Sequence, residues 1–120
     1  MVCGTPLLGH QIRRLSQATF IDEIWVLTTV EAQDEAIANF CAESGVPVFR
    51  GSENDVLQRV AEGLTQSKAN LNVEVTGDCP LIDPRIVDEF VALQMQKYYE
   101  VDAVTSTLET TYPPGLEVFV

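Results

Sequence analysis

The sequence predicts an α/β protein with a mostly parallel sheet and helices on both of its faces. Short apolar runs rich in strand formers alternate with longer stretches whose apolar residues recur at helical spacing. Those stretches are long enough to connect the end of one strand to the start of the next, as parallel strands require. A length of 120 residues without internal repeats predicts a single domain over residues 1–120.

The first part of the chain is predicted to contain two helices and two strands. Apolar residues of the stretch 5–18 fall on one face of a helix, and the run 24–29 is a short strand. The stretch 31–44 has helical spacing and stops at Gly45, a residue type that commonly ends helices. A second short strand is predicted at 46–50.

Two further helices are predicted. The third helix follows Ser52, which is expected to be its N-cap. Its apolar stripe consists of Val56, Leu57, Val60, Ala61 and Leu64. The fourth is expected over 84–99, because Pro84 suits a first helical turn and Asp83 suits the capping position before it. Its expected buried face consists of Ile86, Val87, Phe90, Val91, Met95 and Tyr98.

Three more strands are predicted at 71–75, 102–108 and 116–120, with a turn at 112–115 before the last. A strand in the centre of a parallel sheet is usually apolar on both faces. In the segment 71–75 polar and apolar residues instead alternate. This segment is therefore expected either to lie at an edge of the sheet or to border a cleft.

The charge balance argues against a nucleic-acid partner. The chain has 18 acidic and 7 basic residues and a net charge of −11, whereas binding to DNA or RNA without sequence preference needs a basic face. A small anionic ligand is still compatible with this balance. Backbone N–H groups, an arginine or a divalent cation held by acids are sufficient to bind it locally.

Cysteine usage and hydropathy predict a cytoplasmic protein without a membrane partner. Cys3, Cys41 and Cys79 have no metal-ligand spacing, and their odd number disfavours a disulfide framework. The N-terminus lacks the basic-then-apolar order of a signal peptide, and no apolar run reaches membrane-spanning length.

The polar residues after the predicted strands are binding-site candidates, because ligands of open α/β sheets bind outside the carboxyl ends of strands. Asp78 follows the strand 71–75 after a Thr-Gly pair. A carboxylate there suits Mg²⁺, which takes one or two carboxylates together with phosphate oxygens. The alternative is that Asp78 only shapes a turn. Helix capping fully explains Asp83.

Two further groups of residues are candidates for ligand contact. Arg50, Ser52 and Asp55 are the candidate nucleotide-binding residues, because a helix N-terminus attracts anions. The alternative is a capped helix whose acids only complement its dipole. Tyr112 and Glu117 are the candidate sugar-binding residues, although a rigid turn alone explains the prolines and glycine between them.

Five segments occur in order along essentially the whole chain: GTPLLGHQIRRL, DEIWVLTT, GVPVFRGSENDVLQR, VTGDCPLIDP and TYPPGLEV. Together they resemble the cytidylyltransferases of the spore-coat polysaccharide biosynthesis F type, which are related to the acylneuraminate and 3-deoxy-manno-octulosonate cytidylyltransferases. The resemblance implies a Rossmann-like nucleotide-diphospho-sugar transferase fold and transfer of a cytidylyl group from CTP to a sugar. It also implies that Mg²⁺ bridges the phosphates and Asp78, and that Arg50 and the loop 52–55 approach the nucleotide.

The chain also departs from this family. Relatives begin with a strand and a basic loop that grips phosphates, and the chain is expected to start after both and to be truncated at its other end as well. A sheet that lacks its first strand has an exposed edge, which favours pairing with another chain, so a homo-oligomer is predicted.

Two hypotheses from different classes follow from these features. One is a cytidylyltransferase for cell-surface or spore-coat polysaccharide synthesis. The other is a non-catalytic relative that binds a nucleotide or acts in assembly. A magnesium-dependent phosphatase-like domain is disfavoured, because its usual nucleophile-bearing strand is not found.

Overall fold

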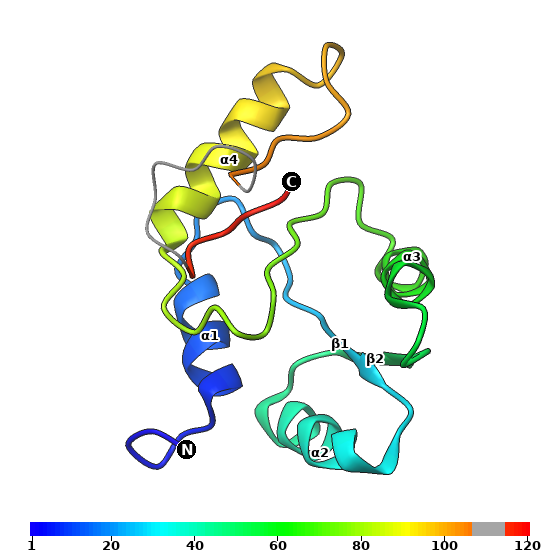
Figure 1. Cartoon of the computed structure of the whole chain (residues 1–120). Helices are drawn as coiled ribbons and strands as arrows, with labels where there is room; N and C mark the ends of the chain where they lie inside the picture. The colour runs from blue at the N-terminus through cyan, green and yellow to red at the C-terminus, as the bar shows by residue number, and fades with distance from the viewer. Residues whose placement is uncertain (107–114) are drawn as a thin grey trace. The chain divides into compact units, whose positions relative to one another are not determined.

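The computed structural model describes residues 1–106 and 115–120. Its contacts divide the chain, traced in Figure 1, into two compact units. The first unit combines Met1–Asp22 with Leu71–Val120, and the second consists of Glu23–Asn70. The single domain predicted over 1–120 stays a prediction, because this division reflects contacts and not independent folding.

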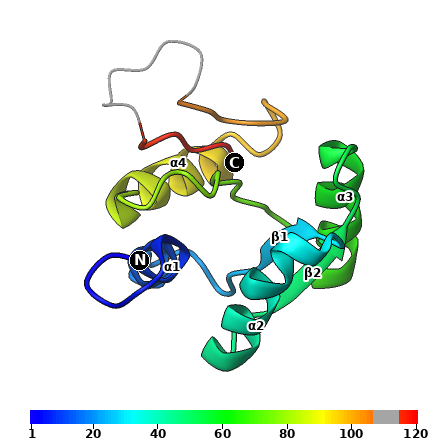
Figure 2. The same cartoon turned by 60° about the horizontal axis from the view of Figure 1, so that its bottom comes forward.

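The second unit is a pair of parallel strands with a helix on each side. Strands β1 (Val26–Thr29) and β2 (Val48–Gly51) pair in parallel along all four residues. Helices α2 (Glu35–Ser44) and α3 (Val56–Ser67) both contact the two strands, and they lie on opposite sides of the pair (Figures 1 and 2). The predicted α/β class, with parallel strands and helices on both faces, is confirmed.

The two helices of this unit end in different ways. Helix α2, which follows the 3-10 helix η1 (Ala32–Asp34), ends at Gly45 as predicted, with a φ of 68°. Helix α3 ends at Lys68, whose φ of 58° is also left-handed. Glycine adopts this conformation freely, whereas a side chain makes it unfavourable. Only the first ending therefore uses the residue type that the backbone geometry favours.

Helix α3 begins later than predicted. Asp55 and not Ser52 is its N-cap, since an Asp55 carboxylate oxygen accepts a 2.8 Å hydrogen bond from the Gln58 backbone N–H. The Ser52 hydroxyl lies one step earlier and accepts from the Asp55 N–H at 3.0 Å. The two side chains therefore form consecutive turns, and the helix starts only after the second of them.

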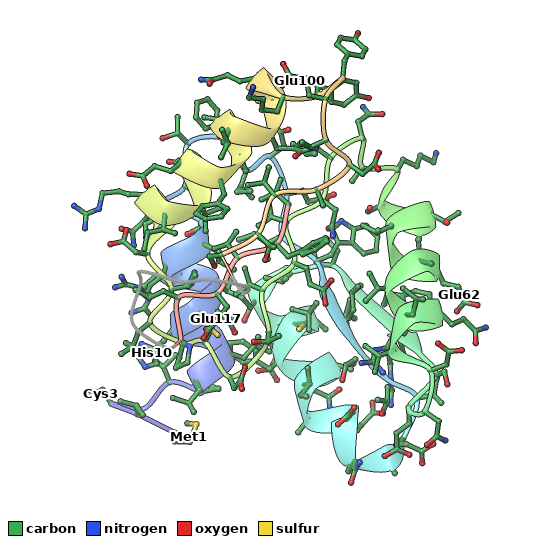
Figure 3. All side chains as sticks on the ribbon, turned by 45° about the horizontal axis from the view of Figure 1, so that its top comes forward. Met1, Cys3, His10, Glu62, Glu100 and Glu117 are labelled. Carbon is green, nitrogen blue, oxygen red and sulfur yellow. The ribbon has the colours of Figure 1, made fainter. Side chains whose placement is uncertain are left out.

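The predicted apolar stripe of α3 is wrong at Val56, Leu57 and Ala61, which are exposed. Val56 and Leu57 are 52% and 80% exposed, so the first turn does not pack on the strands. The helix instead approaches β1 through its buried Gly63, where Leu27 occupies the space that a side chain would need. Glu62 lies on the outward face of the same helix (Figure 3).

The first unit contains helices α1 (Leu7–Leu15) and α4 (Pro84–Gln96), which contact one another. Its core combines side chains of α4 with those of the preceding loop and of the C-terminal segment: Ile82, Ile86, Val87, Val91, Val118 and Val120. Partly buried apolar residues of α1 and of the segment 71–75 pack against this cluster. Each side chain of this size that is fully buried stabilises the fold by about 1.5–3 kcal/mol.

Helix α4 starts as predicted but ends earlier. Asp83 caps it by accepting from the Arg85 N–H at 2.9 Å, and Pro84 is in its first turn. The helix stops at Gln96, and Met95 and Tyr98 are 60% and 59% exposed, so their predicted burial is wrong. The buried face continues instead through Gln94, which lies at the centre of the face formed by Ile86, Val87 and Val91, whereas Met95 lies beyond its edge.

The strands predicted at 71–75, 102–108 and 116–120 do not form regular elements in the described residues. Glu74 and Thr105 each make an isolated antiparallel bridge with Phe119. The C-terminal segment is antiparallel to both neighbours: backbone hydrogen bonds join Phe119 to Glu74, Val120 to Val104 and Val118 to Ser106. These bonds form isolated bridges and no regular strand. Residues 107–108 and most of the predicted turn at 112–115 lie outside the described residues.

Candidate functional site

The segment that carries Asp78 is a tight double turn between Thr76 and Ile82 in the first unit. The Cys79 N–H donates to the Thr76 carbonyl at 3.1 Å, and the Ile82 N–H donates to the Cys79 carbonyl at 3.2 Å. Within this turn Asp78 is exposed, whereas Cys79 is only 3% exposed. The backbone thus presents a carboxylate to solvent directly beside a buried thiol.

Asp78 is held in its ionised form. The Thr76 hydroxyl donates to its carboxylate at 2.5 Å and is the largest cause that lowers the pKa of Asp78, followed by the residue's own backbone N–H. Hydrogen bonds to a carboxylate favour its charged form. This side chain is therefore a negatively charged, oriented and accessible ligand.

Glu117 is a second carboxylate in the same cluster. Its oxygen Oε2 accepts a hydrogen bond of 2.7 Å from the Gly115 N–H, and Gly115 has a φ of 89°, which glycine adopts without strain. The pKa of Glu117 is lowered chiefly by its own backbone N–H and next by the Cys79 thiol, whereas the negative charge of Asp78 opposes this shift. Figure 3 labels Glu117 on the C-terminal segment.

The two carboxylates flank one sulfur atom. The Cys79 Sγ lies 3.4 Å from Glu117 Oε2 and 3.9 Å from Asp78 Oδ1. Burial, and then the Glu117 carboxylate, raise the pKa of the thiol, while the Thr76 hydroxyl opposes them. A thiol that stays protonated is a poor nucleophile, so the buried Cys79 is better explained by packing than by catalysis. The sulfur atom serves as a buried spacer between two acids.

A cavity of about 190 Å³ adjoins this cluster. It is lined by Glu74, Thr76, Glu117, Val118 and Phe119. Hydroxyl and carboxylate oxygens next to apolar side chains are groups that bind a sugar ring or its hydroxyls. The other candidate sugar-binding residue, Tyr112, lies outside the described residues.

The donor set around Asp78 fits a hard cation that shares phosphate ligands. Two ionised carboxylates and a hydroxyl are oxygen donors, which Mg²⁺ prefers. In the part of the chain that the structure describes, no three His, Cys, Asp or Glu side chains are placed to hold an ion between them. A group of three such side chains is not needed for Mg²⁺, because this ion usually binds only one or two carboxylates and takes its other ligands from phosphates and water.

The candidate nucleotide-binding residues lie in the second unit, where Ser52 and Asp55 form the turn before α3. The guanidinium of Arg50 donates to the Thr29 carbonyl at 2.9 Å and to the Glu31 carbonyl at 3.0 Å. It also pairs with Glu35 at 2.7 Å. Arg50 therefore closes the turn between β1 and α2, and its contact with a nucleotide stays a prediction.

Sequence reasoning missed Asp34, which organises the carboxyl end of β1. Its oxygen Oδ2 accepts from the Thr28 hydroxyl, the Thr29 hydroxyl and the Thr29 N–H at 2.8, 2.6 and 3.0 Å. The Thr29 hydroxyl is the largest cause that lowers the pKa of Asp34. The pair of threonines at the strand end was the available signal, but nothing in the sequence identified the acid they bind.

Two side chains of α1 that the sequence did not single out reach the turn that carries Asp78. The Gln11 amide donates to the Thr76 carbonyl at 2.7 Å, and the Arg14 Nε donates to the Ile82 carbonyl at 2.6 Å. His10, labelled in Figure 3, has its Nε2 2.9 Å from the Val2 carbonyl, which accords with a structural role.

None of the helices in the described residues is long and apolar enough to cross a membrane.

The second unit has parallel strands with helices on both sides, as in a Rossmann-like α/β protein, and the first unit carries an oriented carboxylate in a turn. Comparison with known proteins identifies the family within this class. The sequence profile of the cytidylyltransferase family matches residues 2–114. The chain therefore belongs to the cytidylyltransferase family, as its motifs predicted.

Individual relatives agree with this membership. The chain is 36% identical over 118 residues to the mitochondrial 3-deoxy-manno-octulosonate cytidylyltransferase of Arabidopsis thaliana, which covers 94% of this chain and 38% of that protein. It is 30% identical over 89 residues to the spore coat polysaccharide biosynthesis protein SpsF of Bacillus subtilis, covering 71% of this chain and 37% of the relative.

A solved structure supports the fold independently. A cytidylyltransferase from Leptospira borgpetersenii matches with a TM-score of 0.92 and 34% identity, over 97% of this chain and 49% of that one. The Rossmann-like nucleotidyltransferase fold is thereby confirmed. The chain spans somewhat less than two fifths of the length of these two curated relatives.

Proposed function

We propose that the protein transfers a cytidylyl group from CTP to a sugar that enters polysaccharide synthesis. Family membership supports this proposal, and relatives named for spore coat polysaccharide synthesis and for 3-deoxy-manno-octulosonate give its direction. The observation that carries it is the Asp78 carboxylate, exposed and fixed by the Thr76 hydroxyl at 2.5 Å. Transfer between phosphates depends on positioned charge more than on covalent chemistry, and an oriented carboxylate supplies such a charge.

We further propose that Asp78 holds Mg²⁺, with Glu117 as the second acid of the same cluster. Mg²⁺, when bound, neutralises the charge of the phosphates and orients them. Thr76 holds the Asp78 carboxylate in one orientation, and Gly115 and Cys79 do the same for Glu117. The cavity beside Glu117 is the proposed location of the sugar. Arg50, Ser52 and Asp55 are the proposed nucleotide contacts.

The test is release of pyrophosphate from CTP in the presence of Mg²⁺ and a panel of sugars that includes 3-deoxy-manno-octulosonate. Asp78→Asn keeps the shape of the side chain and removes its charge, and we expect it to lower turnover about 10²–10³-fold, the magnitude typical of a lost electrostatic group. Asp102→Asn, at an exposed acid remote in sequence from the cluster, is the matched control and should leave turnover unchanged.

Two other results would decide against this activity. Binding of CTP in calorimetry without any turnover would favour the non-catalytic relative that the sequence left as an alternative. Absence of CTP binding at millimolar concentration with Mg²⁺ would contradict both nucleotide-binding hypotheses.

We also propose a cytoplasmic location and self-association. The three cysteines are free in the structure, as expected in a reducing compartment. Within the described residues, β1 and β2 pair only with one another, so each strand has an outer edge without a strand partner. Such edges favour pairing with a further strand, either of a second copy or of more of the same protein.

A further inference from the structure

Two side chains on one face of α1 donate hydrogen bonds to the two ends of the turn that carries Asp78. Gln11 and Arg14 are three residues apart, so they lie on the same side of the helix. Their acceptors are the backbone carbonyls of Thr76 and Ile82. The helix and the turn are more than 60 residues apart in sequence, and these two bonds join them at both ends of the turn.

The Gln11 contact joins a buried side chain to one carbonyl of the turn. The side chain is 3% exposed, and its Nε2 lies 2.7 Å from the Thr76 oxygen, which also accepts the Cys79 N–H at 3.1 Å. A carbonyl oxygen has two lone pairs, and these two donors use both of them. The bond is partly buried, and loss of the amide would leave the Thr76 carbonyl without one of its two donors, which is unfavourable.

The Arg14 contact holds the other end of the turn. Its Nε donates to the Ile82 carbonyl at 2.6 Å, a charge-assisted bond that is stronger than one between neutral groups. Its positive charge also contributes to lowering the pKa of the neighbouring N-cap Asp83. The end of the turn is thus fixed to α1 at the point where α4 begins.

We propose that Gln11 and Arg14 are positioning residues that hold the Thr76–Ile82 turn closed, so that Asp78 points outward and Cys79 stays buried. The proposal rests on the proposed function only in its catalytic consequence. A carboxylate displaced by about 1 Å costs on the order of 10²-fold in rate, so small opening motions of this turn matter. The turn itself has no regular secondary structure, and Gln11 and Arg14 add an anchor at each end to its two internal backbone bonds.

The burial of Cys79 offers a readout that needs no activity. In the full chain with Cys3→Ser, which removes the exposed thiol, the rates of N-ethylmaleimide modification at Cys79 and at Cys41 are measured by peptide mass spectrometry. Gln11→Met keeps side-chain volume and removes the donor. We expect Cys79 to react roughly tenfold faster in this variant, because the lost hydrogen bond favours local opening.

Cys41 and Gln17 provide the controls. Cys41 is fully buried in α2 of the second unit and should keep its rate within about twofold, which separates local opening from global unfolding. Gln17 lies just after α1, is exposed, and donates to the Arg13 carbonyl. Gln17→Met should therefore leave the modification rates of both thiols unchanged. An unchanged Cys79 rate in Gln11→Met, or an equal rise at Cys41, would overturn the proposal.

Arg14 keeps the proposal testable if Gln11→Met does not fold. Arg14→Met should expose Cys79, and Arg14→Lys, which retains a charged donor, should restore part of its protection. Equal labelling in these two variants would contradict the assigned role of the donor. Where CTP turnover is measurable, Gln11→Met should raise the Mg²⁺ concentration for half-maximal rate. Absence of turnover in the parent would refute the proposed function and leave the labelling result intact.

Discussion

At the residue scale, Asp78 and Asp83 have different explanations although they are only five positions apart. Asp83 is fully accounted for by local structure, because it caps α4 and pairs with Arg85 at 2.7 Å. Asp78 caps nothing, and yet the Thr76 hydroxyl and the turn geometry keep it ionised and exposed. Asp78 is therefore the stronger candidate for ligand binding, because its charge and orientation have no role in helix capping.

The different environments lead to a prediction for acid pH. The side chain of Arg85 is the largest cause that lowers the pKa of Asp83, from its ordinary value of 3.8 to about 2. Because the folded pKa is depressed, the stabilisation from ionised Asp83 is complete above about pH 5 and is lost as the pH falls through 2. An NMR titration of the Asp83 carboxyl should therefore have a midpoint near 2.

Two variants test whether Arg85 is the cause of the lowered pKa of Asp83. Arg85→Gln should move the Asp83 midpoint up toward 3.8, although the Arg85 backbone N–H bond remains and makes the recovery partial. Arg13→Gln removes an equal charge from the exposed side of α1 and should leave the midpoint in place. If both variants shifted the midpoint equally, general charge and not the Arg85 contact would be responsible.

At this scale, contacts between sequence neighbours were predictable from the sequence, and contacts between distant residues were not. The cap by Asp83 and the proline after it were predictable, because the residues involved are neighbours and capping has a known sequence signature. Asp78 was identified by its place after a strand segment. The contacts of Gln11 and of Glu117 with this turn join residues 38 to 65 positions apart, and no local pattern predicts such pairs.

At the element scale, the packing of α3 on β1 depends on a glycine. A Cβ at Gly63 would lie 2.6 Å from Leu27 Cδ2 and 3.1 Å from Cδ1. We expect Gly63→Ala to destabilise the chain by about 1–3 kcal/mol, because overpacking outweighs the better helix propensity of alanine. Urea unfolding followed by the fluorescence of Trp25, the sole tryptophan, measures this change.

A second substitution reverses the sign of that effect. In a Leu27→Ala background the space beside residue 63 is free, so Gly63→Ala should stabilise by about 1 kcal/mol through helix propensity alone. Equal effects of Gly63→Ala in both backgrounds would show that the Leu27 contact is not the reason for the glycine.

The C-terminal ends of α2 and α3 lead to two predictions of opposite sign. Gly45→Ala places a side chain in a left-handed residue and should destabilise by about 1–2 kcal/mol. Lys68→Gly relieves the same conformation at the end of α3 and should stabilise by up to about 1 kcal/mol. Thermal unfolding of the two variants should move in opposite directions, and shifts of the same sign would contradict the argument from backbone geometry.

The elements themselves were predictable to different degrees. Among the described residues, the two parallel strands and the four α-helices follow from apolar periodicity and terminator residues, but most of their ends differ from the predicted ones by a few residues. The segments at 71–75 and 116–120 also have strand composition, but their antiparallel bridges at Phe119 depend on partners distant in the sequence. Composition identifies a strand former and does not determine which partner completes its hydrogen bonds.

At the scale of the whole molecule, charge and strand edges have opposite effects on association. The net charge of −11 makes two copies repel one another, whereas the outer edges of β1 and β2 favour pairing. Salt shortens the range of repulsion, from about 30 Å at 0.01 M ionic strength to about 8 Å at 0.15 M. Hydrogen bonds between strand edges depend far less on salt than this repulsion does.

The self-association that we propose should therefore strengthen as salt is added. Light scattering on the full chain at micromolar concentrations should give a larger mean mass at 0.15 M than at 0.01 M ionic strength, because screening leaves edge pairing less opposed. Association driven by ion pairs would have the reverse dependence and would exclude strand edges as its main cause. A monomer at both ionic strengths would contradict self-association of this chain.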